Sequence, residues 1–108
     1  MAKYFLIESS DPFTSVDVPR HYELAERLRR AGNEVTLFLV DNGVLSARKS
    51  AESGRLADLG RAGVLVLADE LSLRERGVTD AVLSPGVRKA SVDAIAEALE
   101  SGQRAIWA

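Results

Sequence analysis

The sequence contains no cysteine, so the chain cannot form a disulfide, a thiolate metal site, a thiol nucleophile or a persulfide. It also contains a single histidine, His21, and with so few ligand side chains we expect no metal site. The chain also has no large excess of positive or negative charge, because its 14 Lys and Arg residues are nearly balanced by 16 Asp and Glu residues. Proteins that bind nucleic acid concentrate basic charge on one face, so we expect no nucleic-acid partner.

Long hydrophobic runs and glycine-rich phosphate loops are also absent. The early apolar run Tyr4–Ile7 is too short for a signal-peptide core or a membrane span, so we expect a cytoplasmic protein without a membrane partner. The 8 glycines form no Gly-x-Gly pair, and no Gly-Lys-Ser or Gly-Lys-Thr occurs. These absences argue against a Walker loop or a dinucleotide-binding turn, and we expect no cofactor.

The sequence does contain a regular alternation of apolar runs and amphipathic stretches. Its 108 residues, 46% of them hydrophobic, predict one folded domain that spans residues 1–108. Three continuous apolar runs are typical of buried parallel strands, namely Tyr4–Ile7, Val35–Val40 and Val64–Leu67. Weaker strands are expected near Val87 and over Arg104–Trp107.

The stretches between these runs predict helices on both faces of the sheet. The first is expected to begin with Asp17 as its N-cap, with Pro19 in its first turn, and to end at Gly32. A short helix is expected over Leu71–Arg76. Strands that alternate with helices predict an α/β fold, a three-layer sandwich with a mainly parallel sheet of about five strands.

Two further helices complete the pattern. One is predicted over Ala47–Ala62, with three residues facing inward: Ala51, Leu56 and Leu59. The other is predicted to follow Ser91 as its cap and to carry an apolar stripe of four residues: Val92, Ile95, Ala96 and Leu99.

Polar residues gather where the predicted strands end. The carboxyl ends of parallel strands meet at one edge of a sheet, where ligands bind in open α/β proteins. We therefore expect the carboxylates of Glu8, Asp11, Asp41 and Asp69 to converge there. The candidate pocket consists of Ser9, Ser10, Asp11, His21, Asp41, Asn42, Gly43 and Glu70. The same residue types also serve as ordinary turn and capping residues, which is the alternative explanation.

Two of these residues have side chains that could act in catalysis or in metal binding. His21 is the only imidazole available as a general base, although a half-exposed helical histidine without a role is the commoner outcome. Asp41 has the oxygen ligands that Mg²⁺ prefers, but nothing in the sequence distinguishes it from a capping residue. An enzyme built on His21, Asp69 or Ser72 therefore stays open as an alternative.

Several short motifs follow one another in a fixed order. A loop with Pro12 follows the first strand, the first helix ends in Leu28–Gly32, and Asp41–Val44 follows the second strand. Arg76–Thr79 and Leu83–Val87 come later in the chain. In this order and spacing, over nearly the whole chain, they resemble the DsrE/DsrF-like family of small sulfur-relay subunits, which includes the TusD-type proteins of tRNA thiolation.

The resemblance implies a site at which this chain departs from the family. Members that carry sulfur use a cysteine in the loop after the third strand, a few residues before an Arg-Gly pair. When the chain is aligned on Arg76-Gly77, Asp69 takes that position and Ser72 the position of a second cysteine in some members. Neither side chain can carry a persulfide. We expect the Asp69 carboxylate to cap the following helix instead.

The resemblance and the missing cysteine together imply a subunit without catalysis. We expect a structural or regulatory subunit linked to sulfur metabolism, in a homo-oligomer (a trimer or hexamer) or in a hetero-oligomer with related subunits. Phe13, Leu45 and Trp107 are large apolar residues in loops or near the terminus, and they favour self-association. The alternative is a small-ligand- or nucleotide-binding domain that uses the loops at the carboxyl ends of the strands.

Overall fold

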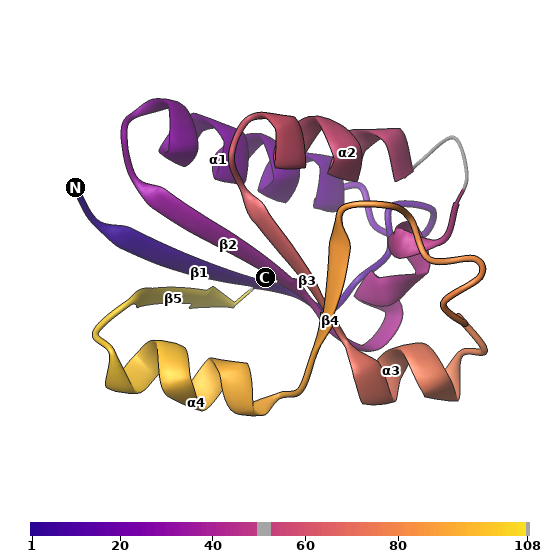
Figure 1. The fold of residues 1–108 in the computed structure, drawn as a ribbon. Helices are drawn as coiled ribbons and strands as arrows, with labels where there is room; N and C mark the ends of the chain where they lie inside the picture. The colour runs from indigo at the N-terminus through magenta and orange to yellow at the C-terminus, as the bar shows by residue number, and fades with distance from the viewer. Residues whose placement is uncertain (50–52, 108) are drawn as a thin grey trace.

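The structure, a computed structural model, describes residues 1–49 and 53–107. Its centre is a sheet of five parallel strands in the spatial order β4-β3-β2-β1-β5 (Figure 1). The strands are β1 (Lys3–Glu8), β2 (Glu34–Leu39), β3 (Leu65–Asp69), β4 (Val87–Ala90) and β5 (Arg104–Trp107). The predicted parallel α/β sheet is therefore confirmed.

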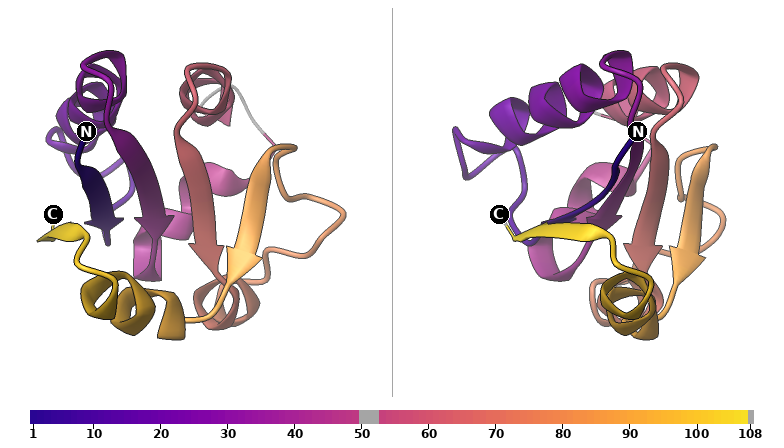
Figure 2. Two further views of the ribbon diagram at one scale, coloured as in Figure 1. Left: turned by 60° about the vertical axis from the view of Figure 1, so that its left-hand side comes forward. Right: turned by 90° about the vertical axis from the view of Figure 1, so that its left-hand side faces the viewer.

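Helices lie on both sides of this sheet and make the fold three layers deep. They are α1 (Val18–Arg30), the 3-10 segment η1 (Asp41–Ala47), α2 (Ser53–Arg61), α3 (Glu70–Glu75) and α4 (Asp93–Glu100). Helices α1 and α2 lie side by side over one face, and α4 lies across the other (Figures 1 and 2). Within the described ranges, no helix is long and apolar enough to cross a membrane.

The two faces of the sheet bury separate apolar clusters. Leu6 and Leu37 are register partners in β1 and β2 and pack toward α1 and α2. The neighbouring positions Phe5 and Phe38 point to the α4 side, where their ring centroids lie 5.7 Å apart. Because both faces of these strands are buried, their sequences are continuous apolar runs and not alternating ones.

The predicted helix over residues 47–62 was wrong at its beginning. Residues 41–47 form η1, Arg48 and Lys49 lie outside any helix, and α2 begins at Ser53. Arg48 instead forms an isolated antiparallel bridge with Leu83, and the Lys49 amide donates to the Val82 carbonyl at 2.7 Å. This pairing with a distant segment overrides the local helical pattern. Leu56 and Leu59 are buried as expected, whereas Ala51 lies outside the described residues.

The caps of two helices also differ from the prediction. Asp17 occupies the N-cap position of α1, but its side chain accepts no capping hydrogen bond and lies 3.7 Å from Arg20 Nη1. Helix α4 has Val92 at its N-cap position, one residue later than predicted. The Ser91 hydroxyl oxygen still accepts a hydrogen bond from the Asp93 amide at 3.0 Å.

Only one of the four residues of the predicted apolar stripe of α4 packs against the sheet. Ile95 packs on the second cluster beside the buried Ala98. Val92 and Leu99 are 54% and 58% exposed, and Ala96 is exposed too. The helix is apolar on two sides, so its periodicity does not determine which side faces the sheet.

Candidate functional site

Three parallel strands end at the same edge and bring polar side chains there together. Glu8 is the last residue of β1, Asp41 follows β2 in η1, and Asp69 is the last residue of β3. Glu8 and Asp69 are almost fully buried, at 1% and 4% exposure, whereas Asp41 is exposed. The three carboxylates at this edge therefore differ in burial, and each has its own hydrogen-bond partners.

Asp69 forms the centre of a closed hydrogen-bonded cluster. Its Oδ2 accepts from the Ser72 amide at 3.0 Å and from the Ser72 hydroxyl at 2.6 Å, which makes Asp69 the N-cap of α3. Ser72 Oγ in turn accepts from the Asp41 amide at 2.9 Å. Both side chains are buried, so neither is presented to a ligand from solution.

The Asp41 backbone has an unusual conformation at this contact. Its φ of 49° lies in the left-handed region, where aspartate is tolerated better than most residues. The next residue, Asn42, accepts a hydrogen bond at Oδ1 from Arg76 Nε at 3.0 Å. Arg76 also donates from Nη1 to the Ser72 carbonyl at 3.3 Å, so it joins the loop after β2 to the end of α3.

Glu8 and His21 form a second cluster at the same edge. Glu8 Oε1 lies 2.5 Å from His21 Nδ1, and Oε2 accepts from the Ser10 amide at 3.3 Å. The His21 side chain is 31% exposed and lies in the first turn of α1. A carboxylate on one ring nitrogen fixes the orientation of the imidazole. No local sequence signal indicates this pair, because its members lie 13 residues apart.

The remaining predicted pocket residues between β1 and α1 have structural partners. Asp11 Oδ1 accepts from the amides of Phe13 at 2.7 Å and Thr14 at 3.1 Å, and Asp11 Oδ2 accepts from the Thr14 hydroxyl at 3.1 Å. This is the local side-chain-to-backbone bonding by which aspartate stabilises a turn. Ser9 and Ser10 are half-buried beside it.

Gly43 holds the loop after β2 against the end of β1. A Cβ at this position would lie 2.2 Å from the Glu8 carbonyl oxygen, so only glycine allows the two backbones to approach so closely. The Gly43 carbonyl accepts from the Ser46 hydroxyl at 3.0 Å, and the Tyr22 hydroxyl donates to Ser46 at 3.0 Å. Gly43 thus has a packing role that connects η1 to both β1 and α1.

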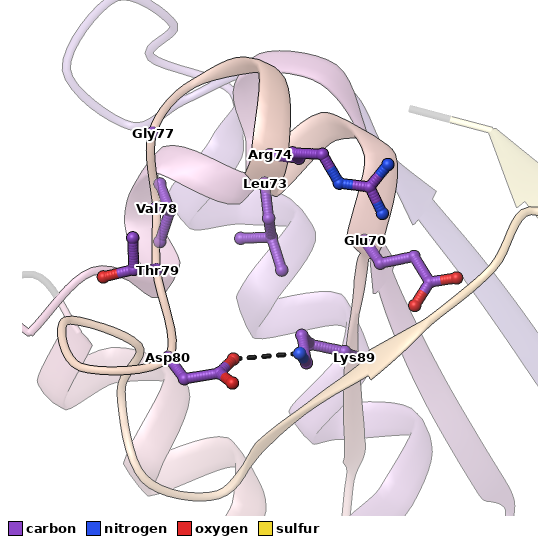
Figure 3. Close-up of a pocket in the computed structure, with 8 residues that line it drawn as sticks. All are labelled: Glu70, Leu73, Arg74, Gly77, Val78, Thr79, Asp80 and Lys89. Carbon is purple, nitrogen blue, oxygen red and sulfur yellow. Dashed lines mark ion pairs between the residues drawn. The ribbon is translucent and has the colours of Figure 1, made fainter.

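Glu70 lies apart from the other predicted pocket residues. It lines a groove of about 300 Å³ between α3, residues 77–80 and β4 (Figure 3). An ion pair of 2.9 Å between Lys89 and Asp80 spans one side of this groove, and Leu73 and Val78 supply its apolar wall. Over residues 1–49 and 53–107, no group of three or more His, Cys, Asp or Glu side chains is arranged to hold a metal ion.

Comparisons with known proteins agree with the fold. The model of the DsrE/DsrF-like family matches residues 2–108. The solved structure of the ychN protein from E. coli superposes with a TM-score of 0.90 at 20% identity, over 100% of both chains. A protein of unknown function from Methanobacterium thermoautotrophicum gives 0.84 at 23% identity, over 99% of this chain and 98% of that one. A conserved protein of unknown function from Bacteroides thetaiotaomicron gives 0.82 at 15% identity, over 98% and 94%. No curated protein sequence matches the chain.

Proposed function

Because this chain belongs to the DsrE/DsrF-like family and contains no cysteine, we propose that it is a non-catalytic subunit of a cytoplasmic oligomer linked to sulfur metabolism. The oligomer consists of copies of this chain, as a trimer or hexamer, or of this chain and related subunits. In this role residues 1–108 act as one domain that supplies structure or regulation. Any sulfur is carried by thiol-bearing relatives, since a persulfide requires a thiol.

The bonding of Asp69 and Ser72 is the observation that carries this proposal. These residues occupy the positions that the family resemblance assigns to cysteines, and both are buried. The Ser72 hydroxyl donates to Asp69 and accepts from the Asp41 amide, so its proton and an oxygen lone pair are already engaged. A side chain bound in this way stabilises the start of α3 and supports a structural role.

Exposed aromatic residues support the assembly part of the proposal. Phe13 is 62% exposed and Trp107 is 65% exposed, whereas Leu45 is half-buried against its own chain. Large exposed aromatic side chains are common at interfaces between subunits. Sedimentation of the purified chain tests this directly. We expect a mass that is a multiple of 11.7 kDa, in the range of a trimer or hexamer, at micromolar concentration. A monomer that also fails to bind purified thiol-bearing relatives would contradict the proposal.

A persulfide-transfer experiment tests the assignment of the former sulfur site. Wild type, Asp69→Cys and the control Ser101→Cys are incubated with a persulfide donor, and the mass of each protein is measured. Wild type should gain no sulfur. Asp69→Cys should gain one atom, because loss of the carboxylate removes the two hydrogen bonds to Ser72 that close the site, and a thiol at a helix N-terminus is acidified by the helix dipole. The exposed Ser101→Cys thiol shows that the donor is active. A sulfur atom gained by wild type would overturn the non-catalytic assignment. An Asp69→Cys thiol that gains no sulfur while the control does would refute the alignment of Asp69 with the family cysteine.

A further inference from the structure

The outward side of α4 carries an apolar stripe that faces solvent. Val92, Ala96 and Leu99 are spaced four and three residues apart, so they share one side of the helix. All three are exposed, and the inward side is occupied by Ile95 and Ala98. An amphipathic helix whose second apolar side is exposed is a typical ligand for a groove on another surface.

An acidic stripe runs beside the apolar one on the same helix. It consists of Asp93, Glu97 and Glu100, each of which follows one residue of the apolar stripe. In the part of the chain that the structure describes, these carboxylates form no ion pair. The surface that best complements α4 is therefore an apolar groove with basic residues along its rim.

A groove with these properties lies at the opposite edge of the sheet. It has a volume of about 510 Å³ and is bounded by α2, the amino ends of β3 and β4, and the turn before β4. Its lining is largely apolar or small, and it consists of Leu56, Ala57, Gly60, Val64, Leu65, Val66, Pro85 and Gly86, with Arg61 and Arg88 as the charged members. A Cβ on Gly60 would meet no atom within 4 Å, so the groove is open above this turn of α2.

The two arginines of the groove differ in their availability. Arg61 pairs with Asp58 on its own helix. Arg88 is exposed and, among the residues described, has no ion-pair partner. It is thus the residue of the rim best placed to attract a carboxylate from another molecule.

We propose that the outward side of α4 binds in the α2–β4 groove of a second copy of this chain. The apolar stripe then covers the apolar lining, and the acidic stripe lies along the rim that carries Arg88. The small residues Ala57 and Gly60 allow the incoming helix to approach α2 closely. This inference rests on the self-association proposed above and assigns to it two surfaces other than those that carry the exposed Phe13 and Trp107.

The positions of the two surfaces determine the kind of assembly. Helix α4 packs on one face of the sheet, mainly against β1 and β2, whereas the groove lies on the other face, between α2 and the β4 edge (Figures 1 and 2). A chain therefore cannot fill its own groove with its own α4. A contact between two different surfaces is heterologous, and it produces closed rings when its rotation allows closure.

The exposed β5 edge is the competing surface for self-association. All four of its residues are exposed, and two β5 edges would pair as a two-fold dimer. Its only charged residue, Arg104, lies over its own Tyr4 ring and donates to that hydroxyl at 3.3 Å. The β5 edge thus offers no complementary charge to a second copy, which favours the α4 contact.

Charge reversal with sedimentation as the readout tests this contact. The variants are Arg88→Glu, Glu97→Arg and the double variant, with Glu23→Arg on the outer side of α1 as the matched control. Each single reversal should raise the dissociation constant at least tenfold, because it brings like charges together. The double variant should regain most of the wild-type affinity. An equimolar mixture of the two single variants should also associate, since each then meets a complementary charge on the other. It should form open or even-membered assemblies, because one contact of a three-membered ring would still join like charges. Circular dichroism checks that every variant is folded.

The outcomes separate this inference from the function proposed above. If wild type assembles and neither reversal weakens assembly, the α4 contact is wrong while self-association stands. If Trp107→Ala alone dissolves the assembly into monomers, the β5 edge is the interface and the α4 contact is again wrong. If wild type is still a monomer at roughly 100 times the micromolar concentration used for sedimentation, both the α4 contact and the homo-oligomer are wrong.

Discussion

Two buried carboxylates at the same edge of the sheet are stabilised in different ways. Asp69 accepts two hydrogen bonds from Ser72, three residues ahead, and both donors are uncharged. Glu8 lies against the imidazole of His21, 13 residues away on another element, with one further bond from the Ser10 amide. Asp69 is therefore satisfied within its own helix start, whereas Glu8 depends on the packing of α1 against β1.

The difference shows which part of the edge is built for stability alone. A carboxylate at a helix N-cap is a common local solution that requires nothing from the rest of the fold. A carboxylate buried against a half-exposed histidine is costly to keep unless the partner stays in place. The substitutions below test this contrast by removing, one at a time, the packing and the partners of the two carboxylates. Unfolding by urea at one fixed protein concentration gives the free energies, because self-association contributes to them.

The largest loss is expected at the glycine that packs against Glu8. Gly43→Ala places a Cβ 2.2 Å from the Glu8 carbonyl oxygen, which forces the end of β1 and η1 apart. We expect a loss of more than about 3 kcal/mol, at the upper end of overpacking effects. Gly54→Ala is the matched control, because its Cβ meets no atom within 4 Å in the first turn of α2 and lies outside the proposed α2–β4 groove. It should stabilise the protein by up to about 1 kcal/mol. Equal effects at the two glycines would show that η1 is free to move away from β1.

Removal of the partner of Glu8 should have the next largest effect. His21→Leu leaves a carboxylate with 1% exposure and, among the contacts given by residues 1–49 and 53–107, the Ser10 amide as its one remaining donor. We expect a loss of about 2 kcal/mol, less than for a fully buried ion pair because the His21 side chain is 31% exposed. The double variant Glu8→Leu/His21→Leu should recover at least half of it, since no unpaired charge remains. A double variant less stable than His21→Leu would show that Glu8 has a role independent of the histidine.

Removal of the cap at Asp69 should cost less. Asp69→Ala deletes the acceptor for the Ser72 amide and hydroxyl, and we expect a loss of about 1.5 kcal/mol. Asp69→Asn keeps an acceptor oxygen and should lose less than half of that. In a double-mutant cycle with Ser72→Ala, the two losses should not add, because the residues share one bond network. Additive losses would contradict the closed cluster on which the structural role of Asp69 depends.

The same contrast explains what could be predicted from the sequence. The strands were located to within about two residues because their apolar runs are continuous, and the Asp69 cap was predicted because an N-cap lies next to the helix it begins. Glu8 and His21 were both expected at this edge, but their direct contact could not be predicted, since only the folded chain sets the distance between them. The start of α2 was misplaced for the same reason, as the bridge of Arg48 to Leu83 is a tertiary contact.

The orientation of α4 shows a different limit of prediction. Its sequence is apolar on two sides, with Ile95 and Ala98 on one and Val92 and Leu99 on the other. Periodicity alone favoured the larger residues for the core. The structure buries the side with the smaller Ala98, which lets the helix approach the sheet and leaves two large residues exposed. A second, exposed apolar side on a helix is the feature expected of an element that also contacts another subunit.

The smallest effect is expected at Arg76, which connects the loop after β2 to α3 outside both carboxylate clusters. Its guanidinium donates to Asn42 Oδ1 at 3.0 Å and to the Ser72 carbonyl at 3.3 Å, and the Asn42 contact is exposed. Exposed contacts of charged side chains contribute little, so Arg76→Ala should cost under about 0.5 kcal/mol. Arg76→Lys, which keeps the charge but loses the planar donor pair, should be equally mild. A loss at Arg76→Ala as large as that at Asp69→Ala would mean that the Arg76–Asn42 bond holds the Asp41 amide against Ser72. The Asp69 cluster would then depend on a tertiary contact as Glu8 does, and the contrast between the two carboxylates would not hold.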